Sequence, residues 1–312
     1  MKTKKLFSVA MITGIFTSVY VNAADLCVNE SGSGGCYSSI SAALAAASDG
    51  DRILIQPKAG GAPYVENLTI NKSVQLLSNQ EGVMWGLTGN ITITPAVGRT
   101  ISILHMKNTT GNISATGDSP VGQRCKVNIM NCELVQGSIN FDYNYFDVNV
   151  VSSILSDGYV AIRFGNIIGN KITSSNSSTT GFAGYHTGLL IKTDALASND
   201  TINIVGNIIQ NTNTYNYTLG IYWTNSSHFF LISNNYVNNS GYYLHRAIGI
   251  VSGKNSSIAT NRVVNNTLFS AVTTNVYIGG TSYGFQGFVV GTSGSPNFQL
   301  EVLNNLILCP NA

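Results

Sequence analysis

The sequence predicts an all-β solenoid in which short parallel strands stack coil upon coil. Three observations predict it. A degenerate motif recurs in the second half of the chain, short apolar runs are many, and charged residues make up only 10% of the 312 residues. Because 44% of the residues are hydrophobic, the chain can fill a core along its whole length. Such repeats are typical of architectures in which each unit packs on its neighbours.

The first 23 residues resemble a secretory signal peptide. Lys2, Lys4 and Lys5 precede a short apolar run, and a Val-Asn-Ala site ends at Ala23. The run is too short and too interrupted for a membrane span, and no later segment is long and apolar enough. We therefore expect a secreted or cell-surface protein, with a signal peptide over 1–23 and one solenoid domain over 24–312.

Removing this peptide takes three positive charges from a formal net charge of +2 and leaves −1. We therefore expect no binding to nucleic acid, which depends on neutralising phosphates with Lys and Arg.

The five cysteines suit an exported protein. Cys27 and Cys36 close a short Gly/Ser loop, and we expect a disulfide between them. Cys125 and Cys132 could close a second loop, and Cys309 is left over. No Cys/His grouping has zinc spacing, so we expect no metal and no other cofactor.

A short helix is expected before the first strands. In "SSISAALAAASDGDRILIQP", Ile40, Leu44 and Ala47 lie on one helical face, and Ser38 or Ser39 can cap its start. Residues 52–56 read as a strand, and two more follow within 64–78. An amphipathic helix at this place would cover the open end of the first coil.

The recurring motif centres on asparagine. A β-branched residue follows each aligned Asn by two positions, and glycine-led strands (from Gly188, Gly220, Gly249 and Gly287) precede it. Asn tolerates a left-handed bend, and stacked Asn side chains can hydrogen-bond along the solenoid axis. The motif therefore predicts a corner followed by an inward-facing strand. The aligned residues are Asn166, Asn207, Asn235, Asn261 and Asn305.

The chain resembles the right-handed parallel β-helix proteins of the pectin-lyase-like superfold. The segment "SISAALAAASDGDRILIQP…YVENLTINKSVQLLS" is similar to their capping helix and first coils, and the Asn-centred coils from about 127 to 308 are similar to their generic repeat. The resemblance implies a right-handed parallel β-helix with a short N-terminal capping helix. It says little about activity, because the superfold contains lyases, hydrolases, esterases and adhesins.

The known catalytic motifs of that superfold are missing. The Gln-Asp-Thr and Asp-Phe-Ile-Phe-Gly segments of pectin methylesterases do not occur, and polygalacturonase motifs are matched only by Lys192-Thr193-Asp194. No adjacent acidic pair exists for glycoside hydrolysis. The scattered acidic residues do not favour the calcium cluster of pectate lyases.

A polysaccharide lyase could still use a basic pair. Arg163 and Lys192 are candidate catalytic residues, with Asp194 and His186 beside them in consecutive coils. The alternative is solvated surface charge. His228 and His245-Arg246 lie in expected turns, and we interpret them as exposed polar residues.

Aromatic residues offer a different binding site. Tyr222 and Trp223 are adjacent on one expected strand, so they should face opposite sides of its sheet. They are candidates for contact with sugar rings, and the alternative is that they fill the core.

Three functions remain open from the sequence. The first is a secreted or cell-surface protein that contacts extracellular polysaccharide, the second is a polysaccharide lyase, and the third is an adhesive or structural solenoid. The last strand, Leu306–Leu308, has nothing after it that could close the coil, so we expect a C-terminal extension or a partner at this end.

Overall fold

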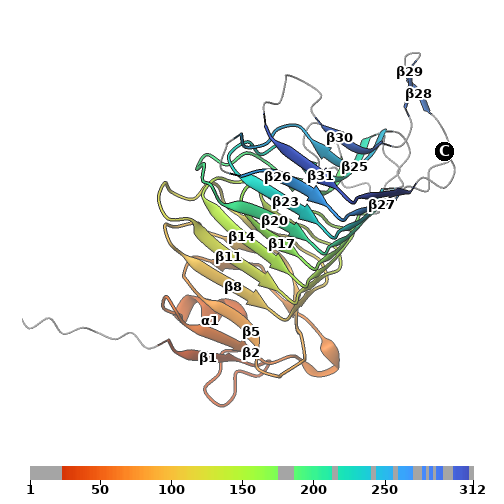
Figure 1. The fold of residues 1–312 in the computed structure, drawn as a ribbon. Helices are drawn as coiled ribbons and strands as arrows, with labels where there is room; N and C mark the ends of the chain where they lie inside the picture. Colours follow the sequence, from red (N-terminus) through yellow and green to blue (C-terminus); the bar gives the residue numbers. More distant parts are fainter. Residues whose placement is uncertain are drawn as a thin grey trace, which may run out of the picture.

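The protein is a parallel β-helix, which confirms the predicted fold class (Figure 1). The structure, a computed structural model, describes residues 23–174, 186–212, 217–239, 244–255, 259–269, 276–278, 281–283, 286–290 and 298–308. The expected signal peptide and Cys309 lie outside the described residues. A typical coil contributes one strand to each of three parallel sheets, which we call A, B and C in the order in which the chain visits them.

Sheet A has eleven strands in the described part of the chain: β1 (Asp25–Val28), β2 (Arg52–Ile55), β5 (Gln75–Ser78), β8 (Thr100–Leu104), β11 (Cys125–Met130), β14 (Phe146–Val151), β17 (Gly165–Ile168), β20 (Thr201–Val205), β23 (Phe229–Ser233), β26 (Asn261–Val264) and β31 (Leu300–Leu303).

Sheet B has ten strands over the same residues: β3 (Tyr64–Val65), β6 (Trp85–Thr88), β9 (Met106–Asn108), β12 (Glu133–Leu134), β15 (Ile154–Ser156), β18 (Lys171–Ser174), β21 (Ile208–Asn211), β24 (Tyr236–Asn239), β27 (Thr267–Phe269) and β32 (Leu306–Leu308).

Sheet C has nine described strands: β4 (Leu68–Ile70), β7 (Ile91–Ile93), β10 (Ile113–Ala115), β13 (Ile139–Phe141), β16 (Val160–Ile162), β19 (His186–Ile191), β22 (Tyr217–Trp223), β25 (Leu244–Ile250) and β30 (Gln286–Val290). The expected glycine-led strands belong to this sheet. Gly249 pairs with Tyr222, two positions beyond Gly220, so that part of the glycine alignment was wrong. An antiparallel hairpin, β28 (Val276–Ile278) and β29 (Thr281–Tyr283), projects from the stack (Figure 1).

A capping helix closes the N-terminal end of the stack, as predicted (Figure 1). Helix α1 spans Ile40–Ala46, and the Ser39 hydroxyl accepts a hydrogen bond from the Ala42 main chain at 3.1 Å. The Glu66 carboxylate accepts from Ile40 N at 3.0 Å, while Lys72 Nζ donates to carbonyl groups at the other end of the helix. An anion at the first turn and a cation at the last both complement the helix dipole. A short 3-10 turn, Ala59–Gly61, follows β2.

An asparagine ladder runs along the corner between sheets A and B. In each step the side-chain oxygen of one Asn accepts from the main-chain N–H and the Nδ2 of the Asn one coil earlier, at 2.9–3.0 Å. Each Nδ2 also donates to a main-chain carbonyl of the preceding coil at 2.8–2.9 Å. The ladder residues are Asn170, Asn207, Asn235, Asn266 and Asn305.

Two residues of the predicted ladder lie elsewhere. Asn166 pairs with Asn203 on the outer face of sheet A, in a second, half-buried ladder. Asn261 is buried at the start of β26, five positions before the ladder residue of its coil. Each motif contains more than one Asn, so the sequence alignment selected the wrong member in these two coils.

The left-handed residue of the corner precedes the ladder residue. Asn234, Asn265 and Asn304 have φ between 53° and 57°, and the glycines before Asn170 and Asn207 also have positive φ. The sequence motif predicts the left-handed bend at the ladder Asn itself, and this prediction is wrong. Two neighbouring residues are needed at this corner. The ladder Asn points its side chain inward, and the residue before it adopts the left-handed conformation that turns the chain.

The cysteines are only partly as predicted. Cys27 and Cys36 form a disulfide, which confirms that prediction. Cys125 and Cys132 are buried and unbonded, so the suggested second loop does not exist. Burial raises the pKa of the Cys132 thiol to about 12. Both side chains therefore act as small apolar core residues.

The C-terminal coil exposes core positions. Val302 and Ile307 stand above the buried residues Val263 and Leu268, yet their exposed fractions are 45% and 51%. The two edges of this coil, β31 and β32, are the last described strands of sheets A and B.

Candidate functional site

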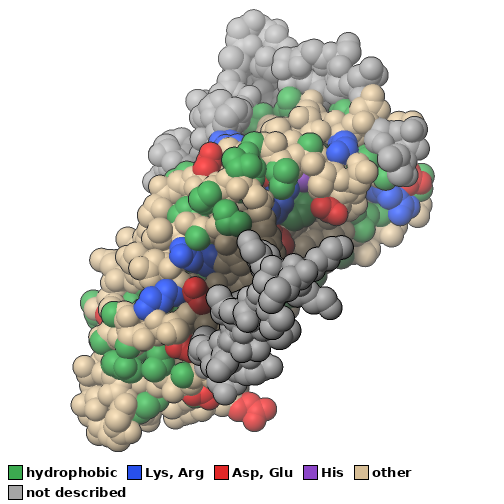
Figure 2. Space-filling view, turned by 90° about the vertical axis from the view of Figure 1, so that its left-hand side faces the viewer, with side chains coloured by type: hydrophobic (Ala, Val, Ile, Leu, Met, Phe, Trp, Pro, Cys, Tyr) green, Lys and Arg blue, Asp and Glu red, His purple; other side chains and the backbone are tan. Residues whose placement is uncertain are grey.

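Charged side chains gather at the corner where strands of sheet C end and strands of sheet A begin. We call the stacked turns 116–124, 142–145, 163–164, 192–200 and 224–228 the charged corner. Figure 2 looks onto the side of the molecule that carries the left-hand loops of Figure 1, and it shows basic and acidic side chains interspersed over this face. Because the stacked turns differ in length, the longer ones can bring their side chains into contact with those of neighbouring coils.

Arg163 and Lys192 meet at this corner, where both bind the carboxylate of Asp142. Arg163 Nε lies 3.1 Å from Asp142 Oδ1, and Lys192 Nζ contacts Oδ2. Arg163 also donates to the side chain of Asn144 at 2.9 Å and to the Thr193 carbonyl at 3.0 Å. The two cations therefore link three successive turns through one anion.

Asn144 connects this group to the preceding coil. Its main-chain N–H and its Nδ2 both donate to the Asp118 carboxylate, at 2.8 and 2.9 Å. The hydrogen bond from the Asn144 side chain lowers the pKa of the Asp118 carboxyl, so Asp118 stays ionised near neutral pH.

Asp194 is buried, with an exposed fraction of only 2%, so it cannot contact a substrate from the surface. It binds the Arg124 guanidinium and accepts from the main-chain N–H of Tyr145 at 3.2 Å. Burial raises the pKa of this carboxyl, but the contacts with His228 and Arg124 outweigh burial and lower it overall.

His228 is also buried, so our interpretation of it as an exposed residue was wrong. The centroid of its ring lies 4.7 Å from that of the Phe164 ring. The Arg124 guanidinium also packs on the Phe164 ring, 3.9 Å from its centroid. The turn that carries His228 is packed into the corner against Phe164.

Tyr222 and Trp223 face opposite sides of sheet C. Trp223 is fully buried in the core, 4.6 Å from the Phe230 ring, and its indole N–H donates to the Asn225 carbonyl. Tyr222 packs with Ala161 and Leu190 in a separate cluster outside the main core. Trp223 contacts the charged corner only from inside the core, through its bond to Asn225. The side chains of His186, His245 and Arg246 lie outside the described residues.

A hollow of about 390 Å³ lies beside the charged corner, over the first residues of β8, β11 and β14. Its floor is a column of side chains in register, Thr100, Lys126 and Asp147, with Phe164 next along the stack. Burial raises the pKa of the Asp147 carboxyl, and Lys126 Nζ lies 3.9 Å from it. The lining residues are Gly98, Thr100, Gly122, Gln123, Arg124, Lys126, Asp147, Phe164, Leu196 and Asp200.

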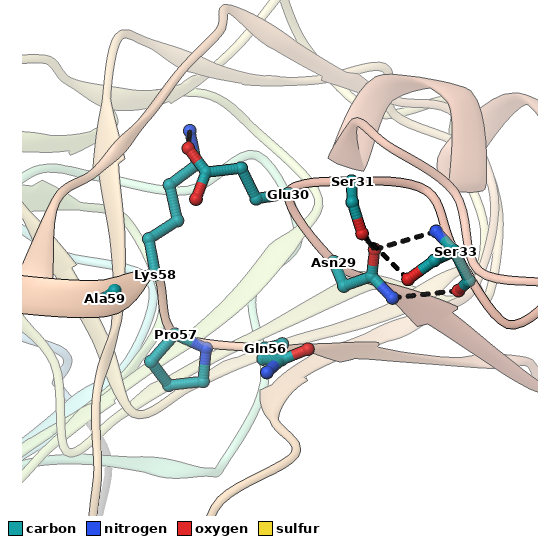
Figure 3. A pocket seen from close by; sticks show the side chains of 8 residues that line it. All are labelled: Asn29, Glu30, Ser31, Ser33, Gln56, Pro57, Lys58 and Ala59. Carbon is teal, nitrogen blue, oxygen red and sulfur yellow. Dashed lines mark hydrogen bonds and ion pairs between the residues drawn. The ribbon is translucent and has the colours of Figure 1, made fainter.

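A second hollow, of about 380 Å³, lies beside the disulfide loop (Figure 3). On one side Lys58 and Glu30 form an ion pair at 3.6 Å, and on the other Asn29 bonds the main chain and side chains of its own loop (Figure 3). Its polar groups bind one another, so this hollow offers fewer groups to a ligand than the first.

Within the described residues, no group of three or more His, Cys, Asp or Glu is placed to hold a metal ion. No helix in the same part of the chain is long and apolar enough to cross a membrane. The sequence matches no protein-family model and no curated protein. Fold and site therefore define the class, a parallel β-helix with a charged corner and an adjoining hollow, and the pectin-lyase-like superfold stays a resemblance.

Proposed function

We propose that this protein is a secreted or cell-surface β-helix that binds extracellular polysaccharide at the hollow over β8, β11 and β14. One observation carries the proposal. The hollow combines an apolar wall, formed by Phe164 and Leu196, with carboxylate, amide, hydroxyl and cationic groups that point into one space. Sugars present both C–H faces and hydroxyl groups, and binding sites of this composition suit them.

The charges in the hollow favour hydroxyl recognition over attraction of a polyanion. Arg124 and Lys126 face Asp147 and Asp200, so the two signs balance. Arg124 is already bound to Asp194 and to the Leu196 carbonyl, and its position is fixed before a ligand arrives. Fixed groups lose little conformational entropy on binding.

The lyase alternative rests on Arg163 and Lys192 as free cations. Both are bound to Asp142, and Arg163 makes two further hydrogen bonds. Such a group cross-links turns, because one carboxylate holds both cations. We therefore prefer the binding function.

Affinity electrophoresis against alginate, pectin, glycosaminoglycan and neutral glucans tests the proposal. We expect retardation in at least one gel, and a severalfold weaker interaction in Lys126→Met and Asp147→Asn. Lys107→Met is the matched control, because Lys107 is an equally exposed lysine on sheet B, paired with Glu133. Equal retardation of all four proteins would overturn the assignment of the hollow, and no retardation in any gel would favour the structural solenoid.

A further inference from the structure

The charged corner contains a second arrangement that glycan binding does not use. Ser198 Oγ lies 3.1 Å from His228 Nδ1, and His228 Nε2 lies 3.5 Å from Asp194 Oδ2. We propose that Ser198, His228 and Asp194 form a nucleophile–base–acid triad that hydrolyses acyl esters. This activity goes beyond the proposed glycan contact and does not depend on it.

The geometry fits the roles of a serine triad. The nucleophile and the base are within hydrogen-bond reach, and a carboxylate lies on the far side of the base's ring, 3.5 Å from Nε2. With its proton on Nε2, His228 leaves the Nδ1 lone pair to accept from the Ser198 hydroxyl. In the more familiar triads Nε2 faces the serine and Nδ1 faces the carboxylate. Here Nδ1 faces the serine and Nε2 faces the carboxylate, but the order serine, histidine, carboxylate is the same.

Other contacts fix the two partners of the serine. Asp194 is completely buried as a side chain and is neutralised by Arg124, so it can remain ionised beside the imidazole. His228 is held against Phe164, whose ring centroid lies 4.7 Å from that of the imidazole. A base that is fixed in orientation before the substrate arrives is a requirement of this chemistry.

The serine lies where a substrate can reach it. Ser198 is half-buried, and Leu196 and Asp200, which flank it in the chain, both line the 390 Å³ hollow. Lys254 Nζ donates to the carbonyls of Ser198 and Ser227, at 2.6 and 3.4 Å, and so ties together the turns that carry the nucleophile and the base.

The Ser198 hydroxyl has a second acceptor. Its Oγ donates to Asp200 Oδ2 at 2.6 Å and accepts from the Asp200 main chain at 3.2 Å. The hydroxyl must rotate from Asp200 to His228 before reaction, because Asp200 Oδ2 and His228 Nδ1 are two acceptors for its one proton.

The reaction balances without a cofactor. Ser198 Oγ attacks the carbonyl carbon of an ester, and its proton passes to His228 Nδ1. The C–O bond to the leaving alcohol then breaks, and His228 gives the proton to the alcohol oxygen. Water attacks the resulting acyl-serine, His228 accepts the water proton, and the carboxylic acid leaves as Ser198 regains its proton. The hollow suits a small acyl group on a hydroxylated carrier.

Two measurements test the triad on the full chain. A fluorophosphonate probe should label Ser198, located by mass spectrometry of peptides, and para-nitrophenyl acetate should be hydrolysed with turnover. Ser198→Ala should abolish labelling and lower hydrolysis by about a hundredfold or more. Ser226→Ala, an exposed serine of the same corner, is the matched control and should change neither.

His228 is buried, so a variant there could fail to fold, and Ser198→Ala together with the peptide mapping keeps the test decisive. Loss of labelling in a folded His228→Gln supports His228 as the base. Full labelling kept in a folded His228→Gln would overturn that role. A folded wild-type protein that is neither labelled nor active would overturn the triad while leaving the glycan-binding result unaffected.

Discussion

Replacing Asn207 with leucine should destabilise the β-helix far more than a comparable change on its outer surface. The Asn207 amide is buried and makes four contacts. Its Oδ1 accepts from the main-chain N–H and Nδ2 of Asn170, at 2.9 and 3.0 Å, and its Nδ2 donates to the Ile167 carbonyl at 2.8 Å and to Asn235 Oδ1 at 2.9 Å. Leucine supplies none of these contacts.

The loss in free energy of unfolding depends on which partners of Asn207 lose their only hydrogen bond. Asn235 Oδ1 still accepts from the main-chain N–H of residue 207, at 2.9 Å. The main-chain N–H of Asn170 has no other acceptor among the described residues and is left unpaired in the interior. An unpaired buried N–H costs about 1–3 kcal/mol, and with the remaining lost bonds the total is about 2–5 kcal/mol.

Two further variants distinguish the loss of the buried ladder bonds from the general effect of replacing an asparagine in a strand or corner. Asn203→Leu removes bonds of the outer ladder, at 2.8 and 3.3 Å, where water can replace them, so we expect about 1 kcal/mol or less. Asn207→Ser keeps an acceptor oxygen at this position. Ser153 is the equivalent residue one coil before Asn170, and its hydroxyl accepts from the Cys132 N–H at 3.1 Å. The cost of Asn207→Ser should be intermediate.

Urea unfolding followed by circular dichroism measures the order of the three variants. The expected order of destabilisation is Asn207→Leu, then Asn207→Ser, then Asn203→Leu. Equal midpoints for the two leucine variants would refute the reasoning, because burial of the amide would then make no difference.

The fold could be predicted because its determinants are local and repeated. Each coil carries an alternation of apolar residues and a corner residue suited to a left-handed bend, and several copies agree even where one is irregular. The exact ladder could not be predicted, because Asn166 and Asn170 lie in the same motif and only the pairing between coils distinguishes them.

The N-terminal cap was predictable for a related reason. The helix pattern around Ile40 is local, and Glu66 and Lys72 lie at the positions where the first coils turn back beneath it. Opposite charges at the two ends of a short helix agree with its dipole, so local sequence and tertiary structure favour the same arrangement.

The candidate sites were much harder to predict. Arg124 and Asp194 are 70 positions apart, and no motif links them. Turn lengths vary from coil to coil, so the repeat fixes the strands but not which turn residues meet. His228 looked exposed because it lies in a turn, whereas that turn is covered by Arg124 and Phe164. A buried histidine with both ring nitrogens in polar contact is visible only in three dimensions.

Three further predictions follow from burial and exposure. Asp194→Asn should destabilise fully above pH 4 and progressively less below it, because the folded pKa of Asp194 lies below the unfolded value of about 3.9 and its stabilisation is lost as pH falls; urea midpoints at several pH values measure this. Cys125 and Cys132 should resist alkylation until the chain is denatured, and rapid modification of the native protein would contradict their burial. The C-terminal coil should cause self-association, because Ile307 occupies an inward position but is 51% exposed, and the strand edges beside it can pair with another chain. Light scattering should show mass rising with concentration for residues 24–312. Ile307→Lys should suppress the rise, whereas Ile208→Lys, at a 43% exposed site on the side of the stack, should not. A stable monomer across a wide concentration range would show that this end of the solenoid does not associate.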